Sequence, residues 1–309
     1  MRDVSGACFP GMLMAIMGAT GSGKTSLMNI LARRLVLSKG LRVSGAVLLN
    51  GAPRPRQWKS NYVEQHDLLF AELSVRETLQ FAARLRLPTT ATPAERDARV
   101  DAVVATLGLQ AVLDSRVGGD LVRGISGGER KRLALGNDLI VDPPLLFLDE
   151  PTSGLDAFNA QSVMSSLKLL ASTGRSVVAC LHQPRSGITA LFDSLLLLSE
   201  GRCMYSGPAP EALLFFERCG FVSPPVRSRH GYIGTLALVL TSALSILQPA
   251  STLIPLISTW TSSLCRSARP RRRRRRGRVW RFWQTPALLN YQRCCRLCAH
   301  LRTKAARKA

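Results

Sequence analysis

The stretch Gly18-Ala-Thr-Gly-Ser-Gly-Lys24-Thr25 decides the fold of this chain. It fits the pattern G-x-x-x-x-G-K-[ST], which describes a glycine-rich loop that cradles phosphate groups. The apolar run 13–17 before it predicts a buried strand, and the apolar spacing over 26–37 predicts a helix after it. Strand, loop and helix in this order indicate an α/β fold built around a P-loop.

The chemistry of this P-loop, residues 18–25, follows from its composition. Glycines let the backbone turn its N–H groups toward phosphate oxygens, and the start of the following helix adds partial positive charge. We expect the Lys24 ammonium to reach the β- and γ-phosphates and the Thr25 hydroxyl to ligate Mg²⁺. The predicted nucleotide-binding residues are Gly18, Ala19, Thr20, Gly21, Ser22, Gly23, Lys24, Thr25 and Ser26.

A second stretch, Ile125-Ser-Gly-Gly-Glu-Arg-Lys-Arg132, predicts another helix start. Ser126 and Glu129 have the spacing of a capping box. Gly127 and Gly128 in the first turn are costly for a helix, which indicates that another group approaches the backbone there. Exposed N–H groups at this helix N-terminus would make a second anion site, far along the chain from the first.

Two apolar strands lead into candidate catalytic residues. The run 145–149 ends at Asp149 and is followed by Glu150, and the run 176–181 is followed by His182. Open α/β sheets bind ligands at the carboxyl ends of parallel strands, so we expect all three beside the P-loop. Asp149 fits an acid that holds Mg²⁺, Glu150 could orient an attacking water, and His182 could contact phosphate. Solvated acids and a structural histidine are the alternatives.

The remaining elements complete an α/β domain over residues 1–222. Capping boxes that begin at Ser74 and Thr92 predict two helices, which belong to a helical subdomain of about 74–140. Two short strands with a turn are expected over 43–51, as a small antiparallel part. The segments 195–198 and 203–205 predict a terminal hairpin.

The positive charge of the chain is concentrated in its last part. The net charge is +22, but 18 of the 42 Lys and Arg residues and none of the 20 Asp and Glu residues follow position 225. Residues 1–225 therefore have an ordinary balance of charge, and a basic whole-chain composition does not by itself indicate nucleic-acid binding. The tail 223–309 contains an uncharged stretch, 231–265, and an arginine run, 271–276.

The eight cysteines do not form a disulfide framework. Cys180 lies in an apolar strand pattern, where a buried free thiol is expected. Cys294, Cys295 and Cys298 cluster near His300, but no second paired ligand set accompanies them, so zinc binding is not favoured. Scattered thiols are typical of a reducing compartment.

Together these stretches resemble the nucleotide-binding domain of ABC transporters, with the motifs in the family's order. Finer features are similar to the G subfamily, the White and pleiotropic-drug half-transporter type. These features are Val4-Ser-Gly, Val75-Arg-Glu-Thr-Leu, Arg123 to Arg132, Leu148 to Ala157 and His182-Gln-Pro184. The general motifs are the P-loop, Gln65, Ile125 to Glu129, Leu145 to Glu150, Ser153 to Asp156 and His182.

The resemblance implies an ATPase that is active only as a dimer and drives transmembrane transport. Each ATP, with Mg²⁺, would lie between the P-loop of one domain and Ser126, Gly127, Gly128 and Glu129 of a second domain. Gln65 would contact Mg²⁺ and the attacking water, which adds it to Thr25 and Asp149 as a metal ligand. Glu150 would polarise the water, His182 would hold the γ-phosphate, and Asp156 would couple the two sites. The domain would face the cytoplasm beside a membrane domain.

The chain departs from the family's pattern at both ends. It begins at the equivalent of the second strand, so the first strand and the aromatic residue that stacks on adenine would lie upstream. After about residue 222 the resemblance fades, and no membrane domain is recognisable; residues 231–247 are at the lower length limit for a membrane span. We interpret the tail as a segment without recognisable fold, and a gene-model artefact is one hypothesis for its origin.

Two alternative functions stay open on the sequence. The first is a soluble ABC ATPase that acts on nucleic acid or ribosomes through the arginine-rich tail, although the G-type features make a nucleic-acid partner unlikely on sequence grounds. The second is a non-catalytic fragment that pairs with a complete transporter. The presence of Lys24 and Glu150 argues against this loss of chemistry. The transported substrate cannot be inferred from these motifs.

Overall fold

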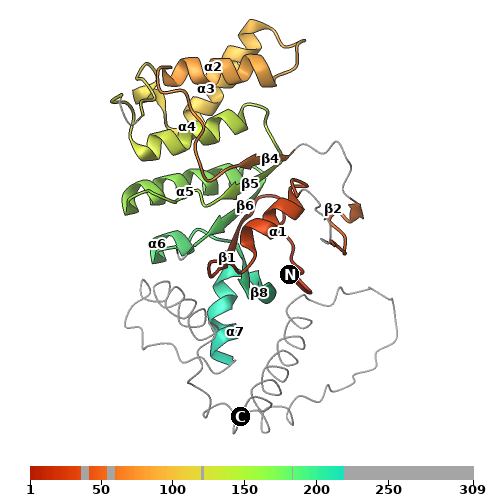
Figure 1. Ribbon diagram of the computed structural model, residues 1–309. Helices are drawn as coiled ribbons and strands as arrows, with labels where there is room; N and C mark the ends of the chain where they lie inside the picture. The colour runs from red at the N-terminus through yellow and green to blue at the C-terminus, as the bar shows by residue number, and fades with distance from the viewer. Residues whose placement is uncertain (36–41, 54–59, 120–121, 183, 219–309) are drawn as a thin grey trace, which may run out of the picture. The chain divides into compact units, whose positions relative to one another are not determined.

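The structure is a computed structural model that describes residues 1–35, 42–53, 60–119, 122–182 and 184–218 (Figure 1). The predictions for the tail therefore lie outside the described residues. These are the uncharged stretch, the arginine run and the cluster of Cys294, Cys295 and Cys298 with His300. Within the described residues, no helix has the length and apolar character that crossing a membrane requires.

A six-stranded sheet forms the centre of the fold, with strand order β4-β5-β6-β1-β7-β8. The first five strands in this order run parallel, and β8 pairs antiparallel with β7, as the predicted terminal hairpin requires. The mostly parallel α/β core predicted from the sequence is thus confirmed. The strands are β1 (Leu13–Gly18), β4 (Ser60–Val63), β5 (Leu145–Asp149), β6 (Ser176–Leu181), β7 (Ser194–Ser199) and β8 (Arg202–Pro208).

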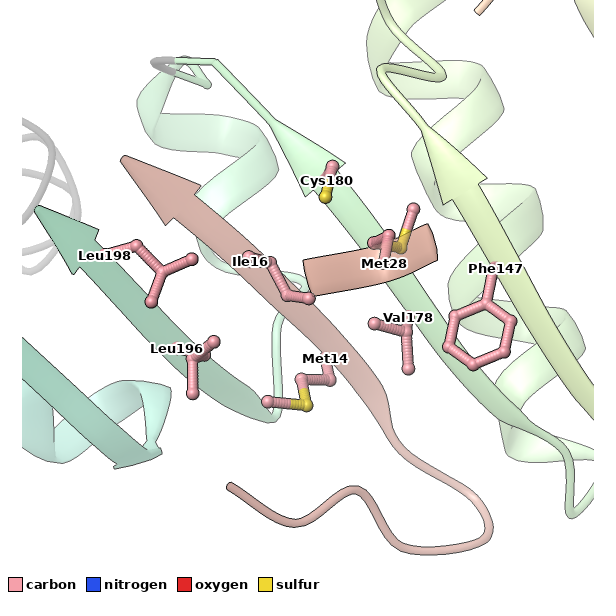
Figure 2. Packing of buried hydrophobic residues seen from close by; sticks show 8 residues of the cluster. All are labelled: Met14, Ile16, Met28, Phe147, Val178, Cys180, Leu196 and Leu198. Carbon is pink, nitrogen blue, oxygen red and sulfur yellow. The ribbon is translucent and has the colours of Figure 1, made fainter. Parts of the chain in front are cut away.

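Burial on both faces explains why the central strands are continuous apolar runs. All six residues of β1 are buried between β6 and β7. Figure 2 shows one apolar cluster on a face of the sheet, closed by Met28 of helix α1 (Lys24–Leu31). Cys180 is a buried free thiol in this cluster, as predicted, and burial raises its pKa. The cluster contains Met14, Ile16, Met28, Phe147, Val178, Cys180, Leu196 and Leu198.

Helix α1 is shorter than the predicted helix over 26–37. It begins at Lys24 and ends at Leu31, because Arg33 adopts a left-handed backbone conformation with φ of 57°. The Arg34 side chain then turns to Glu64, with which it forms an ion pair. Apolar spacing continued past this point in the sequence, but the local backbone stops the helix.

Three helices pack on one another beside the sheet (Figure 1): α2 (Val75–Arg86), α3 (Pro93–Leu107) and α4 (Gly127–Leu139). Each begins with a complete capping box, at Ser74, Thr92 and Ser126, as the sequence predicted. Gly108 ends α3 in the left-handed conformation. Helix α4 also packs against β4 and against α5 (Ala157–Ser172), a helix that the sequence analysis did not identify.

The small antiparallel sheet lies later than predicted. It consists of β2 (Leu48–Leu49) and β3 (Ala52–Pro53), joined by a turn at Asn50 and Gly51, rather than two strands within 43–51. Both turn residues have positive φ, which suits an Asn-Gly hairpin turn. Strand β4 was also missed, because it is short and follows a basic stretch of sequence. The shorter helices are α6 (Ser186–Thr189), α7 (Ala212–Arg218), and the 3₁₀ turns η1 (Gln110–Val112) and η2 (Ala209–Glu211).

Helix α5 allows a matched test of the core, because Leu167 is fully buried and Leu169 is 58% exposed on the same helix. We expect Leu167→Ala to lower the free energy of unfolding by about 2–5 kcal/mol through loss of burial and creation of a cavity. Leu169→Ala should change it by less than about 0.5 kcal/mol. Chemical denaturation of both variants measures the difference, and equal effects would contradict this packing of α5.

Candidate functional site

The strand order brings the predicted nucleotide-binding, metal-binding and catalytic residues to one edge of the sheet (Figure 1). Strands β4, β5, β6 and β1 are parallel neighbours, so their carboxyl ends meet there. The P-loop follows β1, and Asp149 and Glu150 lie at the end of β5. Gln65 comes just after β4, and His182 directly follows β6. The site is therefore assembled by topology from four separate segments of the sequence.

The P-loop is folded tightly against the end of the β7–β8 hairpin. A Cβ atom on Gly18 would lie 2.3 Å from the Leu198 carbonyl oxygen and 2.5 Å from Ser22 Oγ, so only glycine fits. The Gly201 N–H donates to the Ser22 carbonyl at 3.1 Å. Ser22 Oγ itself is buried without a hydrogen-bond partner. The loop thus holds an unused polar atom inside a closely packed turn.

Lys24 is nearly buried and folded back over the loop. The residue is 7% exposed, and Nζ donates to the Gly18 carbonyl at 2.9 Å and the Ala19 carbonyl at 3.1 Å. Helix α1 begins at Lys24 with Gly23 as N-cap, no capping side-chain hydrogen bond and no acidic residue in its first turn. A helix start without a capping side chain leaves its N–H groups available to an anion. These features fit a phosphate ligand.

A chain of hydroxyl and carboxylate groups lies next to this helix start. Thr25 Oγ1 donates to Asp149 Oδ1 at 3.3 Å, and the Tyr62 hydroxyl donates to Asp149 Oδ2 at 2.9 Å. Asp149 is 9% exposed. Burial and the hydrogen bond to Asp149 raise the pKa of Tyr62, so its hydroxyl keeps its proton. Hard oxygen donors of this kind suit Mg²⁺.

Glu150 combines a strained backbone with a direct link to Gln65. Its φ is 48°, in the left-handed region that residues with a Cβ rarely adopt. The Glu150 N–H donates to the Cys180 carbonyl at 3.1 Å, which fixes this conformation. Gln65 Nε2 donates to Glu150 Oε2 at 2.9 Å. Strained residues cluster at functional sites, and this one presents its carboxylate at the shared strand edge.

His182 joins the P-loop directly. Its Nε2 lies 2.9 Å from Thr20 Oγ1, in a hydrogen bond whose direction depends on the histidine tautomer. The structure thus brings together Thr20, Lys24 and Thr25 of the P-loop with Asp149, and joins His182 and Glu150 to the same edge. Within the described ranges, no hydrogen bond or ion pair links residues 126–129 to the P-loop.

The start of α4 instead contacts the start of α5. The Asp156 carboxylate caps α5 by accepting from the N–H groups of Phe158 and Asn159 at 3.1 and 3.3 Å. Hydrogen bonds from Asn159 lower the pKa of Asp156. A Cβ on Gly128 would lie 2.3 Å from Asn159 Oδ1, so the group that approaches this glycine belongs to the same chain. Gly127 has room, because its Cβ would lie 3.5 Å from the Leu155 Cδ2 atom.

Comparison with known proteins places this chain in a family. Residues 1–153 match the protein family described as ABC transporter. The chain is 49% identical over 226 residues to "ABC transporter G family member 7" of Arabidopsis thaliana. It is 50% identical over 227 residues to "Broad substrate specificity ATP-binding cassette transporter ABCG2" of Bos taurus.

This chain belongs to the ABC transporter family. The same relatives, with "Protein white" of Drosophila melanogaster at 43% identity over 244 residues, support the predicted resemblance to the G subfamily. These three alignments cover 72%, 73% and 77% of this chain but 31%, 34% and 36% of the relatives. The chain thus spans about a third of the length of the curated relatives it matches.

A solved structure supports the ABC-type fold. It is cbiO1 from Clostridium perfringens, described as part of the ABC transporter complex cbiONQ. The TM-score is 0.57 at 25% identity, and the match covers 68% of this chain and 82% of that chain. The predicted P-loop ATPase architecture is therefore confirmed for the described part of this ABC family member.

Three residues at the site were missed by sequence reasoning. Tyr62 binds Asp149, Asn159 contacts Gly128, and Lys131 donates to the Gln65 carbonyl at 2.8 Å and to Asp67 Oδ1 at 2.9 Å. Lys131 lies in the basic run 130–132, where solvated charges are the ordinary interpretation. Lys131 also lies within the quoted stretch Arg123 to Arg132, but no role was assigned to any of the three, because each acts through a contact with a distant segment.

The two neighbouring glycines of α4 provide a matched test of this geometry. Gly128→Ala should lower the free energy of unfolding by about 1–3 kcal/mol, because the new methyl group overlaps Asn159. Gly127→Ala should change it by no more than about 1 kcal/mol, in the stabilising direction, because alanine favours the helix. Thermal or urea unfolding compares the two. Equal tolerance at both positions would show that Asn159 does not pack on Gly128.

Proposed function

We propose that this chain binds and hydrolyses ATP as the nucleotide-binding part of a G-type ABC transporter. The observation that carries the proposal is the convergence of Lys24, Asp149, Glu150 and His182 at the carboxyl ends of adjacent parallel strands. Each residue has the chemistry that phosphoryl transfer to water needs at such an edge. Family membership favours the same activity.

The triphosphate of ATP would occupy the P-loop. Backbone N–H groups of residues 18–26 and the start of α1 would surround the β-phosphate, and Lys24 would exchange its carbonyl partners for β- and γ-phosphate oxygens. Thr25, Asp149 and Gln65 would hold Mg²⁺. When bound, this ion neutralises charge on the phosphate oxygens. The buried Ser22 hydroxyl supports the proposal, because it lacks a partner in the described protein.

Glu150 would orient and polarise the water that attacks the γ-phosphorus. Its hydrogen bond from Gln65 places one carboxylate oxygen, and the other is left to accept from water. His182, already bonded to Thr20 of the P-loop, would contact the γ-phosphate. Catalysis in this arrangement is positioning together with charge neutralisation.

A second ABC ATP-binding domain would complete the site. Ser126, Gly127, Gly128 and Glu129 would then face the partner's γ-phosphate, and Asp156 would connect the two sites. The room at Gly127, in contrast to Gly128, supports Gly127 as the residue whose backbone a phosphate can approach. The relatives are transporters by name, so we infer a membrane domain as a further partner, with this domain on its cytoplasmic side.

Lys24→Ala tests nucleotide binding. Loss of the ammonium should weaken ATP binding by about 10- to 100-fold, as expected for a charge-assisted hydrogen bond. Lys168→Ala is the matched control, because Lys168 pairs with Asp193 away from the P-loop. Equilibrium binding of a fluorescent ATP analogue to the full chain measures both. Unchanged affinity in Lys24→Ala would contradict the P-loop assignment.

Glu150→Gln tests the catalytic assignment. The amide keeps the shape of the side chain but is a poor base, so ATP should still bind while turnover falls by at least about 100-fold. Phosphate release is measured over a range of protein concentrations. In the unmodified chain, activity per molecule should rise with concentration if two domains form the site. Normal turnover by Glu150→Gln would contradict the proposal that Glu150 polarises the attacking water.

A further inference from the structure

Lys131 points inward from α4 toward the segment that follows β4. Its side chain is 4% exposed, and Nζ lies 2.8 Å from the Gln65 carbonyl oxygen and 2.9 Å from Asp67 Oδ1. The Asp67 side chain is 17% exposed. A buried ammonium group needs such partners, because an unpaired charge in this environment is strongly unfavourable.

The neighbouring arginines of the same basic run make different contacts. Arg130 donates to the Gly118 carbonyl at 2.9 Å, and Arg132 donates to Ser162 Oγ at 3.2 Å. Lys131 is therefore the member of this run that holds the segment after β4. Its compact ammonium can serve a carbonyl and a carboxylate at once.

The segment 65–70, here named the Gln65 loop, has little else to hold it. Within the described ranges, no backbone–backbone hydrogen bond involves residues 65–70. Leu68 and Phe70 are 85% and 65% exposed. The two hydrogen bonds from Lys131 reach the first and third residues of the loop. Gln65 in turn donates from its side chain to Glu150.

We propose that Lys131 is a positioning residue that fastens the Gln65 loop to α4 and so holds the Gln65 side chain against Glu150. The inference rests on the proposed ATPase function and deepens it. Lys131 does not touch the reacting atoms; it acts through the Gln65 carbonyl. The helix that carries Ser126 and Gly127 is thereby joined to the catalytic carboxylate within one chain, so a displacement of α4 displaces Gln65.

The first test uses proteolysis of the full chain without nucleotide. Lys131→Met keeps side-chain length but removes the charge and both hydrogen bonds. Chymotrypsin cleavage after Leu68, Leu69 or Phe70, identified by fragment mass, should become about tenfold faster, because the loop opens more often. Lys168→Met is the control, since it removes another partly buried lysine–aspartate pair outside this loop. Equal cleavage rates in Lys131→Met and the unmodified chain would overturn the proposal.

The second test separates positioning from a general structural role. Lys131→Met should lower kcat for ATP hydrolysis by about 10- to 100-fold, as small misplacements of catalytic groups do. KM for ATP should stay within about twofold, because the P-loop is not altered. An unchanged kcat would overturn the proposal.

A second variant keeps the test decisive if the single substitution does not fold. Lys131→Met with Asp67→Asn leaves no unpaired charge, so the fold is retained while the tie to the Gln65 carbonyl is still lost. The same faster cleavage and lower kcat are expected, and normal values for both would overturn the proposal. Absence of ATPase activity in the unmodified chain would count against the proposed function instead, while the nucleotide-free cleavage rates would still decide whether Lys131 holds the loop.

Discussion

The parallel pairing of β1 with β6, and of β5 with β4 and β6, is the constraint on which the site depends. A residue at the carboxyl end of one strand meets the equivalent residue of its neighbour only if the strands run in the same direction. Apolar packing on both faces of β1 fixes this register, because a shift by one residue would turn Met14 and Ile16 out of their cluster. The position of the P-loop is therefore secured by the apolar burial of the strand that leads into it.

Local patterns in the sequence predicted much of this arrangement. The P-loop, the strand that ends in Asp149 and the capping boxes at Ser74, Thr92 and Ser126 each combine a short pattern with a specific physical requirement. Such signals are complete within a few residues, so they do not depend on knowledge of the fold. The mostly parallel sheet follows from them, since strand–loop–helix units favour parallel strands. Membership of the ABC family followed from their order.

The features that sequence reasoning missed depend on contacts between distant segments. Tyr62 meets Asp149 from 87 positions away, and Lys131 meets the Gln65 carbonyl from 66 positions away. Asn159 matters because its side chain packs against Gly128, which lies on another helix. Even the end of α1 was misjudged, because apolar spacing suggested continuation while the left-handed Arg33 ended the helix. Tertiary contacts and single backbone conformations are not encoded in a periodic pattern.

The folded-back Lys24 affects how nucleotide affinity arises in this domain. Its ammonium already has two carbonyl partners, on Gly18 and Ala19, in the described protein. A phosphate group that reaches Lys24 replaces existing hydrogen bonds. Its contribution to the binding free energy is therefore the difference between the ammonium bonded to phosphate and the same ammonium bonded to the two carbonyls. The released carbonyls must then find water or another donor. Affinity for nucleotide can therefore be tuned by the backbone of the loop as well as by the charge of the lysine.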